Sequence, residues 1–118
     1  MTVTYAQVAA LPKAELHLHV EGTLEPELAL KLAARNGVPL RHADAAELRR
    51  AYAFTSLVSF LDLYYECMAA LRTAEDFADL ASAYLARAQA DGVTRAEVFF
   101  DPRCTSPAGC PWTRSSAG

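Results

Sequence analysis

Apolar residues recur with two different periods along the first hundred residues, and these periods predict strands and helices in turn. Alternation of leucine and valine with polar residues predicts a strand at about 14–21, and Ala-Glu-Val-Phe-Phe at 96–100 places a second strand at about 95–101. Apolar positions three and four residues apart predict helices in the sequence between them. These helices are expected at 26–36, 43–52, 55–71 and 73–91, after a short helix at 4–11.

Helix ends carry local signals that support this division. Thr4 is a suitable N-cap for the first helix, and Pro12 stops it. Asn36-Gly37 is typical of a helix C-terminus, and Thr73 followed three residues later by Asp76 resembles a capping box. The order is strand, several helices, strand, which favours an α/β fold with a helical insertion in a parallel crossover.

One predicted helix is unusually rich in aromatic side chains. We interpret its stripe as core packing in preference to a ligand-binding surface. The stripe comprises Leu57, Phe60, Leu61, Tyr64, Tyr65, Met68 and Leu71.

Two histidines in the first strand are the strongest candidates for chemistry. Strand alternation places His17 and His19 on one face, and Leu16, Leu18 and Val20 on the other. Two neutral imidazoles on one face can bind a divalent metal such as zinc. Glu21 has the same parity, so it would point into the same site if the strand extends that far. The alternative roles are core histidines and a polar residue at a strand end. His42 is interpreted as a solvated loop residue.

Composition removes several classes of function. The 118 residues include 14 acidic and 11 basic side chains without a basic patch, so nucleic-acid binding is not indicated. No apolar run reaches the roughly 18 residues of a membrane span, and the N-terminus lacks a secretory signal pattern. Cys67, Cys104 and Cys110 do not have metal-type spacing. We therefore expect a cytoplasmic protein with reduced thiols; its oligomeric state is left open.

The motif around the histidines extends over a long stretch. Residues 11–27, Leu-Pro-Lys-Ala-Glu-Leu-His-Leu-His-Val-Glu-Gly-Thr-Leu-Glu-Pro-Glu, resemble the first strand and turn of the adenosine/adenine deaminases. Phe60-Leu61-Asp62-Leu63-Tyr64-Tyr65, Thr73 with Asp76-Phe77, and residues 97–102 continue the resemblance. We take the deaminase-like domain as residues 1–102, with the match covering about residues 4–102.

This resemblance implies the N-terminal portion of a TIM (β/α)8 barrel, which needs about 250 residues when complete. It implies Zn²⁺ as cofactor, His17 and His19 as its first two ligands, and a small-molecule purine as substrate. In this family zinc activates a water that attacks the amino-bearing carbon, and ammonia leaves. Glu21 and the Phe-Phe-Asp-Pro segment favour adenine over adenosine, because nucleoside deaminases commonly carry Asp at the position of Glu21.

The remaining family machinery is not found in this sequence. A third zinc histidine, a proton-shuttle glutamate, a later histidine and a metal-binding aspartate come from later strands in the family. We therefore expect the 118-residue chain to have no catalytic residue of its own, to hold zinc weakly or not at all, and to be inactive. Two other readings are a metal-dependent phosphoesterase, which can also begin with a His-x-His strand, and a non-catalytic helical interaction fragment.

The sequence changes character after Pro102. Residues 103–118 lack apolar periodicity and are expected to be an unrelated, disordered tail. When Cys104–Thr113 is read one base earlier, codon degeneracy permits Met-His-Ile-Ala-Arg-Gly-Val-Pro-Met-Asp, which resembles the segment the family has here. This predicts a frameshifted tail.

Overall fold

The computed structural model describes residues 1–101 and contains two strands, five α-helices and one 3-10 turn. In chain order they are α1 (Tyr5–Ala10), β1 (Lys13–His19), η1 (Val20–Thr23), α2 (Pro26–Asn36), α3 (Ala45–Ala51), α4 (Leu57–Met68), α5 (Ala74–Ala90) and β2 (Val93–Phe99). The predicted tail at 103–118 lies outside the described residues. None of the described helices has the length and apolar character needed to cross a membrane.

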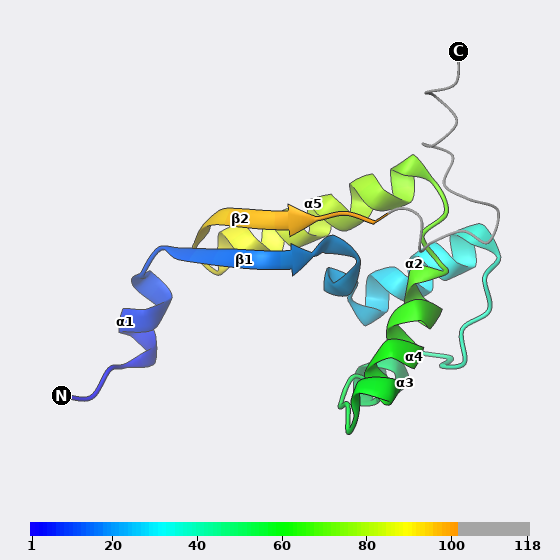
Figure 1. Ribbon diagram of the computed structural model, residues 1–118, viewed down its shortest axis with the longest axis horizontal. Helices are drawn as coiled ribbons and strands as arrows, with labels where there is room; N and C mark the ends of the chain where they lie inside the picture. Colours follow the sequence, from blue (N-terminus) through cyan, green and yellow to red (C-terminus); the bar gives the residue numbers. More distant parts are fainter. Residues whose placement is uncertain (102–118) are drawn as a thin grey trace, which may run out of the picture.

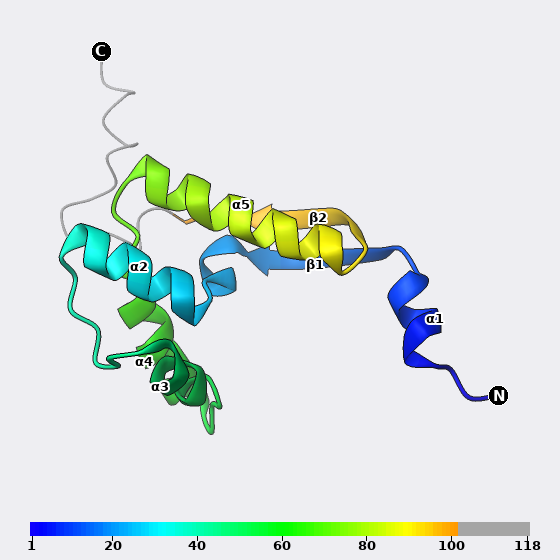
Figure 2. The same cartoon turned by 180° about the vertical axis from the view of Figure 1, so that it is seen from behind.

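The two strands form a parallel sheet with α5 along one face (Figure 1, Figure 2). Their carboxyl ends coincide, because His19 pairs with Phe99. Helices α2, α3 and α4 lie beyond that end, and α1 extends from the opposite end of the sheet (Figure 1). The predicted strand–helices–strand order and the parallel crossover are therefore confirmed. β1 begins one residue and ends two residues earlier than predicted, and β2 begins and ends two residues earlier.

Helix termini follow the local signals in the sequence. Thr4 caps α1 and accepts a hydrogen bond from the Gln7 N–H at 3.3 Å, in a full capping box. Thr73 caps α5 in the same way, with Asp76 as the reciprocal partner. Gly37 ends α2 in the left-handed conformation (φ 65°), where a side chain would be strained.

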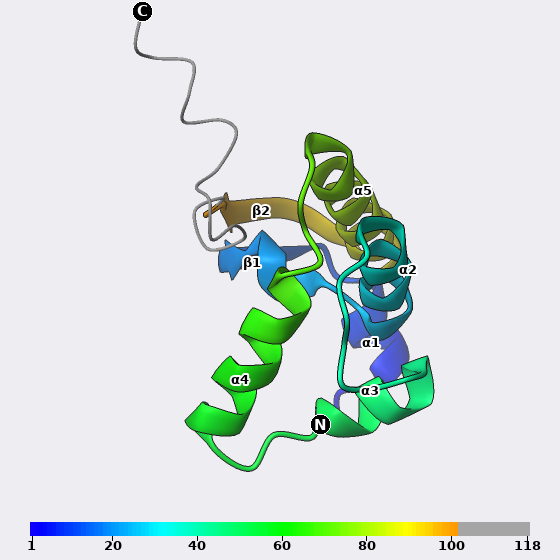
Figure 3. The same cartoon turned by 90° about the vertical axis from the view of Figure 1, so that its right-hand side faces the viewer.

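The hydrophobic core lies between the helices and η1, at the carboxyl end of the sheet. Its fully buried members include Leu32 of α2, Leu48 of α3, Leu71 and Leu80. Figure 3 shows α2 and α5 side by side, where Arg35 and Asn36 of α2 donate hydrogen bonds to the buried Asp76 of α5. This packing holds the segment after β1 against the helix that precedes β2.

One part of the aromatic-stripe prediction is wrong. The buried face of α4 consists of Leu63, Cys67 and Met68, whereas Leu57 and Tyr65 are exposed. Phe60 is 37% exposed and Tyr64 is half-buried. The helix presents its aromatic edge to a pocket next to β1, so the stripe is only partly core.

Candidate functional site

His17 and His19 lie side by side at the carboxyl end of β1. Their ring centroids are 5.3 Å apart, and both rings contact Phe99, the last residue of β2, at 4.5 and 5.3 Å. Both histidines are exposed. Their common face, which the strand pattern predicted, is therefore confirmed, and it lies at the end of the sheet where barrel enzymes place their sites.

The backbone reaches this arrangement through a β-bulge rather than through regular alternation. Glu15 pairs with Ala96 and Leu18 pairs with Val98, so β1 carries one extra residue between these pairs. His17 has φ 57°, the one positive φ at a non-glycine position among residues 1–101. A left-handed conformation at such a residue costs about 1–2 kcal/mol. Strain of this kind is often found at functional sites.

The predicted face of Leu16 is wrong because of the bulge. Lys13 and Glu15 are less exposed than their neighbours, but beyond the bulge the less exposed positions are Leu18 and Val20. Leu16, expected to share a face with Leu18 and Val20, is 65% exposed instead. The alternation changes phase at the extra residue, and a local sequence pattern does not reveal this.

The strand predicted at 14–21 included Glu21. In the structure Glu21 instead belongs to η1. It is 2% exposed, and its Oε1 accepts a 2.7 Å hydrogen bond from the main-chain N–H of Asp101. Within residues 1–101, no donor reaches its Oε2, which is also buried. A buried carboxylate oxygen without a donor is costly, so its position favours a ligand or water that donates to it.

A pocket of about 90 Å³ opens beside Glu21. That volume exceeds the roughly 10–15 Å³ that a single water requires. Glu21 is the single charged side chain in a lining that is otherwise apolar, aromatic or weakly polar. The other lining residues are Gly22, Leu24, Tyr52, Phe54, Phe60, Leu63, Tyr64 and Cys67.

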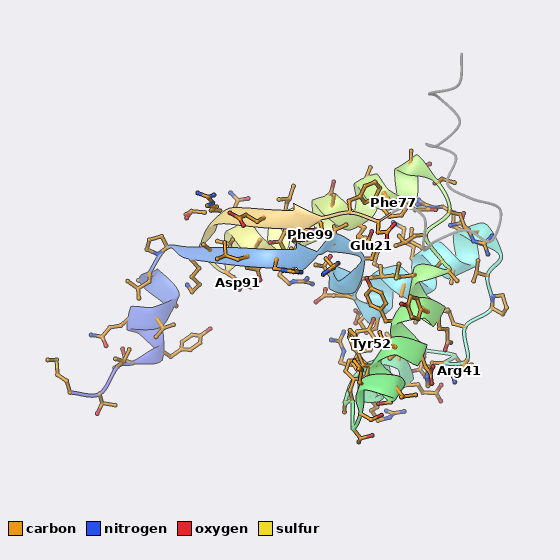
Figure 4. The ribbon with its side chains drawn as sticks, in the orientation of Figure 1. Glu21, Arg41, Tyr52, Phe77, Asp91 and Phe99 are labelled. Carbon is orange, nitrogen blue, oxygen red and sulfur yellow. The ribbon has the colours of Figure 1, made fainter. Side chains whose placement is uncertain are left out.

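This pocket shares a wall with the hollow next to the histidines. Gly22, Phe60 and Tyr64 line both spaces, while His17 and His19 line only the second. A Cβ at Gly22 would lie 3.5 Å from Tyr64 Cε2, so the turn after β1 passes close to the ring. Figure 4 shows Glu21 and Phe99 together near the carboxyl ends of the strands, with Asp91 at the opposite end of the sheet.

The polar groups at the back of the pocket remain neutral. Burial raises the pKa of the Cys67 thiol, although a hydrogen bond with Tyr52 acts in the opposite direction. Burial, followed by the nearby Cys67, raises the pKa of the Tyr52 phenol. The Tyr52 hydroxyl also donates a 2.8 Å hydrogen bond to the Leu24 carbonyl. A flat, apolar ring with one strong donor directed at Glu21 would suit such a lining.

The histidine pair has the chemistry of part of a zinc site. Neutral imidazoles are good zinc ligands, and adjacent rings on one strand face suit one ion. Catalytic zinc normally takes three protein ligands, and no group of three His, Cys, Asp or Glu residues within 1–101 could hold a metal ion. His42 lies half-buried in the loop between α2 and α3 and does not line either space. His17 and His19 therefore fit zinc as two ligands of a larger set.

Comparison with known proteins identifies the family. The model of the family described as Adenosine deaminase matches residues 12–114. The chain belongs to the adenosine deaminase family. The matched range contains both histidines, Glu21 and the complete described sheet, and it extends beyond the change in composition after Pro102.

Several relatives of this chain carry the name adenine deaminase. The protein from Streptomyces coelicolor is 68% identical over 99 residues, which are 84% of this chain and 29% of that protein. The one from Ralstonia pickettii is 54% identical over 105 residues, 89% of this chain and 30% of that protein. The chain thus spans less than a third of the length of these relatives.

A solved structure gives the same result. The adenine deaminase from Arthrobacter aurescens is 58% identical and superposes with a TM-score of 0.74, over 80% of this chain and 29% of that chain. The predicted mixed α/β fold, matching part of an adenine deaminase barrel, is confirmed.

Sequence reasoning did not identify Phe60 and Tyr64 as pocket residues, because their helical spacing also suits a core. A usable signal was present in the adjacent Tyr64 and Tyr65. Neighbouring residues on a helix point about 100° apart, so these two rings are not both directed to the centre of one buried face.

Proposed function

We propose that this chain supplies the first two zinc ligands and part of the base-binding pocket of a hydrolytic adenine deaminase, which converts adenine to hypoxanthine and ammonia. The observation that carries the proposal is the shared wall between the histidine hollow and the Glu21 pocket. A purine ring beside Phe60 and Tyr64 would have one edge near His17 and His19 and another near the free oxygen of Glu21.

Each residue has a separate part in this mechanism. His17 and His19, as neutral imidazoles, would hold the zinc, which supplies Lewis-acid activation of water when bound. Glu21 would accept a hydrogen bond from a purine N–H, which fixes the orientation of the ring. Phe60 and Tyr64 would pack on the ring and exclude water from its faces.

Adenine is preferred to adenosine for two reasons. The relatives named above are adenine deaminases. Glu21 also extends its carboxylate one methylene further into the pocket than Asp would, toward the space that a ribose would need. Adenosine deamination is the second candidate. Family membership removes the basis for the phosphoesterase reading.

The 118-residue chain alone is proposed to be inactive. Its described residues offer two zinc ligands, and neither histidine can serve as a proton shuttle while it holds the metal. Purified chain supplied with Zn²⁺ should produce no hypoxanthine from adenine above the uncatalysed rate. Adenine turnover that a chelator abolishes and added Zn²⁺ restores would contradict this part of the proposal.

A chimera tests the function directly. Residues 1–101 of this chain would replace the matching segment of the Streptomyces coelicolor adenine deaminase. We expect the chimera to deaminate adenine in a chelator-sensitive manner, His17→Ala to abolish this activity, and His42→Ala to leave it unchanged. A folded chimera that is inactive beside an active parent would contradict the proposal.

A further inference from the structure

The pairing between β1 and β2 contains two register shifts that cancel. Lys13 pairs with Val93 and Leu18 with Val98, which is the same offset. Between them, Ala14 and Glu15 pair one residue further along β2, with Arg95 and Ala96. The first shift adds a residue to β2, and the second adds a residue to β1 next to His17.

The displaced segment makes one specific contact outside the sheet. Glu15 accepts a hydrogen bond from the hydroxyl of Tyr84, which is buried on α5 and 5% exposed. This hydrogen bond raises the pKa of the Tyr84 phenol, as does its burial. Glu15 is half-buried and therefore directed to the helix layer, away from the face that holds the histidines.

Regular alternation could not produce both orientations. Residues 15, 17 and 19 have the same parity, so an unbroken strand would put Glu15 on the histidine face or turn both histidines toward α5. The extra residue before Leu18 and the positive φ of His17 allow Glu15 to face α5 while His17 and His19 face away from it.

We infer that Glu15 and Tyr84 are positioning residues: their hydrogen bond holds the bulge that turns His17 and His19 away from α5 and onto Phe99. Neither residue lines the histidine hollow or the Glu21 pocket, so they act through the backbone of β1. The use assigned to this geometry, zinc binding, rests on the proposed function. The geometry itself can be measured without metal.

The test uses NMR on the metal-free 118-residue chain. The one-bond Hα–Cα coupling of His17 distinguishes a positive from a negative φ, and NOEs between the rings of His17 and Phe99 report their contact. We expect Tyr84→Phe and Glu15→Ala each to move the coupling to the negative-φ range and to remove the NOEs. Glu15→Gln keeps an acceptor and should retain both signals.

Tyr52→Phe is the matched control, because it also removes one hydroxyl that donates a hydrogen bond, here to Leu24 O. It should leave the His17 signals unchanged. If Tyr84→Phe does not fold, the Glu15→Ala and Glu15→Gln pair decides, since Glu15 is only half-buried. A folded Tyr84→Phe or Glu15→Ala chain with the wild-type coupling and NOEs would overturn the inference.

Zinc titration of the wild-type chain is read separately. A lack of zinc-induced shifts at His17 and His19, even at a large excess of Zn²⁺, would count against the proposed function while leaving the positioning result intact. The inference would also be overturned if Glu15→Gln lost the bulge to the same extent as Glu15→Ala. A hydrogen-bond acceptor at position 15 would then not be sufficient to hold the bulge.

Discussion

The main-chain N–H of Asp101 donates a 2.7 Å hydrogen bond to Glu21 Oε1, joining the turn after β1 to the chain that leaves β2. This bond occupies one oxygen of a carboxylate that is 2% exposed and leaves Oε2 for a ligand. Glu21 therefore has a structural partner on one side and a binding opportunity on the other. The structural role of Oε1 and the binding role of Oε2 can be tested separately.

Glu21→Gln in the chimera keeps one oxygen for Asp101 but places an amide N–H₂ where the purine would donate. A hydrogen bond to a charged group is worth about 1.5–3 kcal/mol, so we expect kcat/KM for adenine to fall roughly tenfold to a hundredfold. Steady-state kinetics measures it. The control is Glu75→Gln. The Glu75 side chain is 77% exposed and lines neither pocket, so this substitution should leave kcat/KM unchanged. Unchanged kinetics for Glu21→Gln would refute a binding role.

Glu21→Asp tests the choice of substrate. A shorter carboxylate withdraws from the pocket by one methylene, which leaves room for a larger ligand and lengthens the contact to the base. We expect the ratio of kcat/KM for adenine to that for adenosine to fall at least tenfold. The assay compares the two substrates with the same chimera preparation. A ratio that stays constant would show that another residue discriminates between them.

Asp76 makes the stability of the helix group depend on pH. Burial disfavours its charge, but hydrogen bonds from Arg35, the Arg72 and Thr73 N–H groups and Asn36 outweigh burial and lower its pKa from 3.8 to about 2. The stabilisation is complete above pH 4 and is lost as the pH falls through about 2, because protonation then removes the favoured anion. It amounts to about 2 kcal/mol.

Asp76→Asn should therefore lower the free energy of unfolding by about 3 kcal/mol at pH 7, since Arg35 keeps its charge without the buried anion. Asp79→Asn is the control: Asp79 also bonds Arg35, at 2.9 Å, but its side chain is 38% exposed, so the loss should stay below about 1 kcal/mol. Urea titration at pH 7 and pH 3 measures both. Equal losses for the two variants would contradict this account of Asp76.

The uncovered face of the sheet predicts self-association. Leu16 and Phe99 are 65% and 50% exposed on neighbouring strands whose edges are also open within the described chain. We expect sedimentation velocity to show concentration-dependent association that Leu16→Lys weakens. Ser82→Lys adds the same charge to an exposed position of α5 and should have no effect. A chain that remains monomeric, with a cooperative melt, would contradict this expectation.

The proposed change of reading frame is tested by the nucleotide sequence over codons 103–118. We expect the frame one base earlier to encode the His-containing, Arg-Gly segment and to continue into a family-like sequence. Stop codons or unrelated residues in that frame would remove the proposal.

Local signals in the sequence were sufficient for the helices, because caps such as Thr4 and Thr73 and the stop at Gly37 act within a few residues. The histidine pair was also accessible, since its spacing is part of a local strand pattern. The bulge was not, because the contact between Glu15 and Tyr84 joins residues far apart in sequence. For the same reason the burial of Glu21, which depends on Asp101, required the structure.

The central claim, that His17 and His19 together hold zinc, is tested most directly by the imidazole signals of the purified chain. The chain has three histidines, so a ¹H–¹³C spectrum of the rings contains three resolvable sets of signals. We expect Zn²⁺, added in large excess so that a weak two-ligand site is filled, to shift those of His17 and His19 in parallel, to leave His42 unchanged, and to lose its effect on His17 in the His19→Ala variant. Unshifted His17 and His19 signals, or an equal shift of all three histidines, would contradict the claim.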